Sequence, residues 1–406
     1  MRIPFKADDH VTSAIRRLGR TEDMRWSPSG RRLALAGYLR NRVLILEAVT
    51  ETAAEPLLVE LTGHLEIESP SFNHPHGVAW LDEQTVIVAN RYGTVDIFRV
   101  PAPWPASRRV TLEPIQTIGR DRVDLVKNPG SLSVFPIGLG LVEIAVCSGL
   151  VDHVSRHLVD LRDACAVRSS DSLIGTGLQL PDGVAHSRSG RWMAVSSHGG
   201  HCVAVFRNDD CGGVPCGVLR GVHHPHGLVF SGDDKWVLVA DAGAPFLHVF
   251  NSPDSNWNGD REPVSSVQIL GDATFERGHV QPAEGGPKGI DLTRDGALLA
   301  ATCEEDPLVF FDMRPVIGTM AVDAEPAEPA AEAERARRYL LQYLGAARSR
   351  VDETTAAICR IAEREVQLVV ATRWWRVTAP LRRLSETLQG ASQRARNRLR
   401  HAARTG

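Results

Sequence analysis

The chain of 406 residues is poor in several features that would assign it to a class. It has four lysines, at positions 6, 127, 235 and 288, and a net charge of −3, so its overall charge predicts no nucleic-acid partner. Seven scattered cysteines predict no disulfide framework and favour a reducing, cytoplasmic location. The opening MRIPFKADDH lacks the apolar stretch of a secretion signal, and no run of about twenty apolar residues predicts a membrane-spanning helix.

Sequence motifs that mark common enzyme classes are also missing. The chain has no G-x-S-x-G, no P-loop, no G-x-G-x-x-G after a predicted strand and no H-E-x-x-H. These absences give serine-hydrolase, nucleotide-binding and zincin functions no support. The cysteines of CGGVPC, Cys211 and Cys216, have no second pair at the spacing of a zinc finger, so we interpret this segment as a structural loop.

What the chain does contain is a repeat. HPHG occurs at residues 74–77 and again at 224–227, each time before an apolar run, a polar turn and a second apolar run. Six copies of this pattern align at the residue that stands two positions before the first apolar run: EDMRW, HGVAW, GSLSV, DGVAH, HGLVF and KGIDL. Their first residues are Glu22, His76, Gly130, Asp182, His226 and Lys288, separated by 54, 54, 52, 44 and 62 positions.

Each copy continues as short runs rich in Val, Ile and Phe between turn residues, which is typical of antiparallel strands. Six such units predict an all-β fold, a six-bladed β-propeller. Outer strands are expected at residues 56–62, 110–119, 216–221 and 265–270. The last unit lacks one, so we expect residues 12–19, TSAIRRLG, to close the ring as its N-terminal strand. The alternative, a two-sheet sandwich, does not explain a period near fifty residues.

The residue that begins each copy is expected beside the central axis, at one mouth of the channel. The neighbouring glycine lets adjacent backbones approach closely. Five of the six positions are ionisable, and six-fold placement sets His76 opposite His226 and Glu22 opposite Asp182. Such convergence predicts a ligand or metal site. The alternative is a polar, wet channel mouth with no ligand, or a simple turn at the start of each strand.

The residue types at these positions define the chemistry. Glu22, His76, Asp182 and His226 are candidate ligands of a divalent metal such as Zn, Ca or Mn. A bound cation would polarise a carbonyl and lower the pKa of water. Asp182 and His226 are also candidate general bases, and Lys288 a partner for an anionic substrate or a nucleophile.

A second set of residues is expected at the same mouth, because the second strand of each blade runs back toward it. Our predicted ligand-binding residues are Asn90, Arg91, His198, Asp241 and Glu304, with Ser197 and Cys303 nearby. The loop at 271–286, which carries His279, is long enough to cover the mouth. Further histidines lie close in sequence, and each is interpreted as solvated surface: His74, His201, His223 and His224.

Over about residues 12–314, the repeat resembles six-bladed propellers of the NHL-repeat and lactonase-type group. In its gluconolactonase–regucalcin family, a first-blade Glu and later Asn and Asp residues before glycine bind a divalent cation. EDMRW at Glu22 and LPDG at Asp182 resemble two of these elements, and the Asn-Gly element has no match at a ring position. HPHG at His76 and His226 resembles the zinc-binding histidines of peptidylglycine amidating lyase, but here the two are three blades apart. Neither metal site is reproduced intact.

The C-terminal part has a different composition. An acidic linker is predicted at 323–334, between a propeller at 1–322 and a basic α-helical tail at 335–406. The last 76 residues carry about +9 and the remainder about −12. Within the tail, ATRWWRVTAPLRRL resembles the ends of bacterial surface-polysaccharide glycosyltransferases and methyltransferases. This tail is expected to contact an anionic inner membrane face, to self-associate, or to remain a solvated helix.

Two functions from different classes remain open at this stage. The first is a metal-assisted hydrolase, of lactonase type, or a lyase that acts on a small polar, sugar-derived substrate. The second is a non-catalytic propeller that binds a glycan or a protein during surface-polysaccharide assembly.

Overall fold

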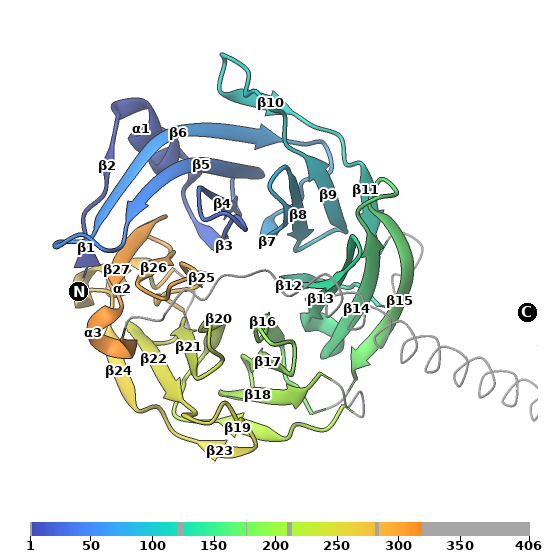
Figure 1. The fold of residues 1–406 in the computed structure, drawn as a ribbon, viewed down its shortest axis with the longest axis vertical. Helices are drawn as coiled ribbons and strands as arrows, with labels where there is room; N and C mark the ends of the chain where they lie inside the picture. Colours follow the sequence, from blue (N-terminus) through green and yellow to red (C-terminus); the bar gives the residue numbers. More distant parts are fainter. Residues whose placement is uncertain (1, 120–124, 176, 209–212, 281–283, 319–406) are drawn as a thin grey trace, which may run out of the picture. The chain divides into compact units, whose positions relative to one another are not determined.

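The computed structural model describes residues 2–119, 125–175, 177–208, 213–280 and 284–318. These residues form six sheets arranged around a common axis (Figure 1). The six-bladed all-β propeller predicted from the repeat is therefore confirmed. The predicted linker at 323–334 and tail at 335–406 lie outside the described residues, so both stay predictions.

Each blade is built from four strands in an antiparallel meander, and the inner strand of each begins at a copy of the repeat. Blades 1 to 3 contain β3 (Thr21–Trp26), β4 (Arg32–Gly37), β5 (Arg42–Glu51) and β6 (Leu58–Glu68); β7 (Pro75–Asp82), β8 (Thr85–Asn90), β9 (Val95–Arg99) and β11 (Gln116–Ile118); and β12 (Pro129–Gly138), β13 (Leu141–Ser148), β14 (His153–Asp160) and β15 (Ala166–Ile174). Blades 4 to 6 contain β16 (Pro181–His186), β17 (Trp192–Ser197), β18 (Cys202–Arg207) and β19 (Gly217–Leu219); β20 (Pro225–Phe230), β21 (Trp236–Asp241), β22 (Phe246–Asn251) and β24 (Ser265–Gln268); and β25 (Ile290–Leu292), β26 (Leu298–Ala301), β27 (Val309–Asp312) and β1 (Arg2–Ile3).

Short additional elements extend the blades. Two strands add to blade 1 by pairing in parallel with β6, namely β2 (Lys6–Ala7) and β10 (Arg109–Thr111). A third, β23 (Gly259–Arg261), pairs with β19 of blade 4. The expected outer strand at 110–119 is thus divided, because its start joins blade 1 through β10 and its end forms β11 of blade 2. The remaining elements are a 3₁₀ turn, η1 (Gly149–Val151), and the helices α2 (Asp272–Gly278) and α3 (Arg314–Ile317).

An N-terminal strand closes the ring, as expected, but a different segment supplies it. β1 pairs antiparallel with β27, with Arg2 opposite Phe311 and Ile3 opposite Phe310. The prediction that residues 12–19 form this strand is wrong, because they belong to α1 (Asp9–Leu18). Asp8 caps that helix by accepting a hydrogen bond from the backbone N–H of Val11 at 2.7 Å. Its buried face has helical spacing: Val11, Ala14, Ile15 and Leu18.

The glycine of the repeat lets neighbouring inner strands approach closely, as predicted. A Cβ on Gly77 would lie 2.7 Å from the carbonyl oxygen of Gly130 in the next blade, and a Cβ on Gly289 would lie 2.6 Å from the Cα of Asp23. Among the described residues, no helix is long and apolar enough to cross a membrane.

Candidate metal centre

Five predicted side chains meet at the axis of the propeller. Each stands at the first position of its copy of the repeat, which a glycine follows in every case except Glu22, where Asp23 follows. They lie on β3, β7, β16 and β20 or just before β25, and we call them the central ring: Glu22, His76, Asp182, His226 and Lys288. All five are buried. The sixth position is Gly130, where a Cβ would lie 2.5 Å from Oδ1 of Asp182 and 3.3 Å from Nη1 of Arg91. The missing side chain therefore leaves the space that the Asp182–Arg91 pair occupies.

The imidazoles and the carboxylates of the ring alternate and point at one another. Nε2 of His226 lies 3.1 Å from Oδ2 of Asp182 and 3.4 Å from Oε2 of Glu22. Nε2 of His76 lies 3.6 Å from Oδ1 of Asp182 and 3.9 Å from Oε2 of Glu22. The two imidazole rings stack with centroids 5.4 Å apart. Four potential metal donors thus converge from four blades.

Three cations surround the two ring carboxylates. Nζ of Lys288 lies 3.0 Å from Oε2 of Glu22 and 2.7 Å from Oε2 of Glu284. Nη1 of Arg91 donates to Oδ1 of Asp182 at 3.1 Å. Arg20 pairs with Oε1 of Glu22 and, at 3.2 Å, with Glu304.

These ion pairs fix the charges of the ring. Burial opposes ionisation of Glu22, but Lys288 and His226 outweigh burial and hold the pKa of Glu22 well below its ordinary value of 4.5. Burial is likewise outweighed at Asp182, where His226 and His76 hold the pKa below its ordinary value of 3.8. At Lys288, Glu22 and Glu284 overcome burial and raise the pKa above 10.5, so the amine stays charged. A charged amine favours the ion-pairing role of Lys288 over the nucleophilic one.

The two imidazoles are shifted in opposite directions. Burial lowers the pKa of His76 to about 3, despite the attraction of Asp182. At His226, Asp182 and Glu22 outweigh burial and raise the pKa above 6.5. Without a bound metal, His76 is therefore neutral down to about pH 3, whereas His226 holds its proton more strongly than an ordinary histidine. The Nδ1 atoms of both have no hydrogen-bond partner among the residues that the structure describes.

Three of the five predicted ligand-binding residues lie around the ring. Arg91 pairs with Asp182, Glu304 pairs with Arg20, and Nε2 of His198 lies 3.5 Å from Oε1 of Glu284. These three side chains are 13 to 24% exposed, against 8% or less for the ring itself. Exposure therefore rises from the ring toward these three side chains.

The other two predicted ligand-binding residues bond within their own blades. Oδ1 of Asn90 accepts from the backbone N–H of Asn73 at 3.1 Å, and its amide donates to Asp96 at 3.0 Å. Asp241 accepts the backbone N–H groups of His223 and His224 at 2.7 and 2.8 Å. Both side chains hold the turn that precedes the inner strand, and their role in ligand binding stays a prediction.

Two residues at the site escaped the sequence analysis. Glu284 belongs to the loop expected to cover the mouth and bonds to Lys288 four positions later. Arg20 stands two positions before Glu22, just ahead of β3, and its side chain pairs with that of Glu22. That spacing of two was a usable signal for Arg20, whereas Glu284 carries none. His279 ends α2, and residues 281–283 of the loop lie outside the described part of the chain.

No protein-family model matches the chain, and no curated protein matches it. A solved protein of unknown function from Desulfotomaculum acetoxidans is 15% identical with a TM-score of 0.48, covering 74% of this chain and 86% of its own. A calcium-binding protein, regucalcin from Agrobacterium tumefaciens, is 12% identical with a TM-score of 0.47, covering 72% of this chain and 88% of its own. The resemblances to NHL repeats and to the glycosyltransferase tail are not confirmed.

Proposed function

We propose that the central ring binds one divalent metal ion through His76, His226, Asp182 and Glu22. The supporting observation is the set of four distances between imidazole nitrogens and carboxylate oxygens, which run from 3.1 to 3.9 Å. Four ligands with bonds of about 2.0–2.1 Å around a tetrahedral ion lie about 3.3 Å from one another. One donor atom each from Glu22, His76 and His226 lies within 4.8 Å of the others, and Asp182 would complete the set by a movement of its side chain, since its Oδ2 lies 3.1 Å from Nε2 of His226.

The carboxylates can hold a metal without losing every cationic partner. Oε1 of Glu22 faces Arg20, which leaves Oε2 directed toward the imidazoles, and Oδ2 of Asp182 faces away from Arg91. Lys288 competes for Oε2 of Glu22, and His226 must lose its proton before it can bind a metal. Two nitrogens and two carboxylates suit Zn²⁺ or Mn²⁺ better than Ca²⁺, which prefers six to eight oxygen ligands.

The residues around the metal define the substrate that we propose, a small polar molecule with an anionic or carbonyl group. A divalent metal at the ring would polarise a carbonyl and lower the pKa of water, as hydrolysis of a lactone or a lyase reaction requires. Arg91 and Lys288 supply positive charge for the anionic group. Burial lowers the pKa of His198, so this imidazole is neutral at pH 7 and can accept a proton.

Metal content tests this proposal directly. Full-length protein purified without chelator is analysed for bound metal, beside His76→Ala and the matched control His74→Ala, which removes the other histidine of the same HPHG segment. We expect His76→Ala to lose one equivalent of metal that His74→Ala retains, and to lose metal-dependent hydrolysis of small lactones. The proposal is overturned if the wild type and His76→Ala bind equal amounts of Zn²⁺ and Mn²⁺ when each is added in excess.

A further inference from the structure

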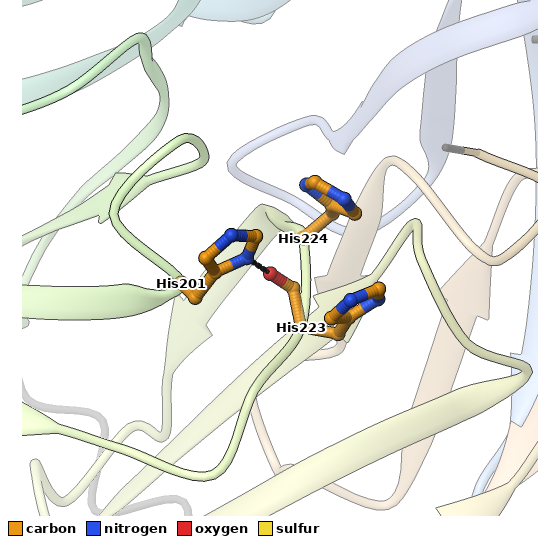
Figure 2. Close-up of side chains that lie close together, drawn as sticks. All are labelled: His201, His223 and His224. Carbon is orange, nitrogen blue, oxygen red and sulfur yellow. Dashed lines mark hydrogen bonds between the residues drawn. The ribbon is translucent and has the colours of Figure 1, made fainter. Parts of the chain in front are cut away.

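Three histidines outside the central ring lie together where blades 4 and 5 meet. His201 belongs to the turn between β17 and β18, and His223 and His224 directly precede β20 (Figure 2). One donor nitrogen from each lies within 4.8 Å of the others. His201 and His223 are exposed and His224 is half-buried. We call these three residues the rim cluster.

The backbone that carries two of these histidines is held firmly. Oδ2 of Asp241 accepts from the N–H of His223 at 2.7 Å, and Oδ1 accepts from the N–H of His224 at 2.8 Å and of Gly243 at 3.0 Å. Asp241 is itself buried and paired with Nε2 of His248 at 3.0 Å. Two adjacent histidines are thus fixed before any ligand arrives, which lowers the entropic cost of binding.

The turn before blade 5 differs in its backbone from the turns before blades 2, 3 and 4. The inner strands of these four blades begin at a proline, and in three of them the residue before the proline has a left-handed backbone: His74, Asn128 and Leu180, with φ of 59°, 55° and 50°. His224, the fourth, does not adopt that conformation. Its ring lies 4.5 Å from the ring of His223 and 4.8 Å from that of His201.

Gly243 makes room for the cluster. A Cβ at this position would lie 2.7 Å from Cδ2 of His224 and still closer to Nδ1 of His223. The equivalent residue of blade 2, Gly93, faces Asn90 and Asn73 instead, at 3.2 and 3.9 Å. Because φ at Gly243 is not positive, the backbone conformation does not require glycine here. The space that the two histidine rings occupy does require it.

One hydrogen bond fixes the tautomer of His201. Nδ1 of His201 bonds to the carbonyl oxygen of His223, shown by the dashed line in Figure 2. A carbonyl only accepts, so Nδ1 carries the hydrogen and Nε2 keeps its lone pair. This is the tautomer of a metal-ligating histidine, whose second nitrogen donates to a carbonyl or carboxylate. Nδ1 of His224 is buried and has no hydrogen-bond partner within the described residues.

We propose that His201, His223 and His224 form a second metal site that takes a transition metal, Zn²⁺, Cu²⁺ or Ni²⁺. Three imidazole donors select these ions over Ca²⁺ and Mg²⁺, which prefer oxygen. The site is separate from the central ring, because His198 stands between them, with its ring 4.6 Å from that of His224 and 6.4 Å from that of His226.

Zn²⁺ titration of metal-free, full-length protein by calorimetry tests the rim cluster. Every variant carries His76→Ala, which disables the proposed metal centre in the ring. The result therefore does not depend on whether the proposal for the ring is correct. In this background we compare His223→Ala and Gly243→Ala with the control Gly93→Ala. Gly243→Ala removes no donor atom and only displaces the two rings.

We expect His223→Ala and Gly243→Ala each to weaken Zn²⁺ binding at least about 10-fold, the lower bound for disturbing a histidine metal site. Gly93→Ala should leave the affinity unchanged, and melting curves confirm that each variant is folded. Nitrogen hyperfine coupling in the Cu²⁺ electron paramagnetic resonance spectrum should report one fewer imidazole ligand with His223→Ala. Absence of Zn²⁺ binding in the His76→Ala background, or equal affinity in all three variants, overturns the proposal.

Discussion

The second histidines of the two HPHG segments, His76 in blade 2 and His226 in blade 5, occupy equivalent positions. Both are buried, and Nε2 of each faces the same two carboxylates, those of Glu22 and Asp182. Their pKa values nevertheless move apart, to about 3 for His76 and above 6.5 for His226.

The distances to the two carboxylates and a nearby arginine account for this difference. His226 lies closer to both carboxylates, at 3.1 and 3.4 Å, than His76 does, at 3.6 and 3.9 Å. Arg91 also acts on His76 and lowers its pKa further. The repeat therefore sets where a histidine lies, and the charges around it set its protonation state. Pairs of groups whose pKa values are driven apart are a frequent property of acid–base sites.

The largest effect should come from removing His226 at a pH below 6.5, where the imidazole carries its proton. In metal-free protein, His226→Ala then takes one positive partner from two buried carboxylates, so we expect the free energy of unfolding to fall by about 3 kcal/mol or more. His76→Ala removes a neutral side chain and should cost about 1–2 kcal/mol. Urea unfolding in the presence of chelator measures both. Equal losses would mean that the two imidazoles carry the same charge.

Much of the fold was predictable from sequence, because strand and turn signals recur at a period near fifty residues. The error at residues 12–19 has a local cause, since the segment was considered without Asp8 and Val11, which reveal the helix cap and the helical spacing. β1 has two residues, too few for any periodicity, so only pairing with β27 identifies it.

The members of the central ring were predictable for the same reason, because one repeat position maps to one place near the axis. Glu284 was not, because its loop belongs to no repeat. The direction of each pKa shift was not predictable either. Shifts depend on distances between side chains from different blades, such as Lys288 to Glu22, which the sequence does not contain.

Asp291, on β25, offers a second test of how surroundings set a pKa, with an expected effect of up to about 3 kcal/mol. Desolvation raises the pKa of Asp291 from 3.8 to about 6, although Arg25 opposes it. Because the folded-state pKa is raised, the stability contributed by protonated Asp291 is complete below about pH 4 and is lost as the pH rises to about 6. A difference of about two pKa units corresponds to about 3 kcal/mol.

Asp291→Asn should therefore flatten the dependence of unfolding free energy on pH between about 4 and 6. The substitution also loses one acceptor, since Asp291 receives the N–H of Trp26 at 2.8 Å and of Leu292 at 3.0 Å. For this reason the slope with pH, rather than the stability at any single pH, is the quantity to compare. An unchanged slope would show that Asp291 is ionised throughout this range.

The smallest expected effect isolates the contribution of Arg91 to the difference between the two histidines. Arg91→Met keeps the length of the side chain and removes its charge, so the pKa of His76 should rise from about 3. It should stay below 6.5, because burial is the largest cause of the shift and remains in place. The pKa of His226 should stay above 6.5, because Asp182 and Glu22 still raise it, so His226 serves as an internal control. Histidine resonances followed by NMR across a pH titration of the metal-free protein report both values. An unchanged pKa for His76 would assign the whole contrast to burial and to the distances from the carboxylates.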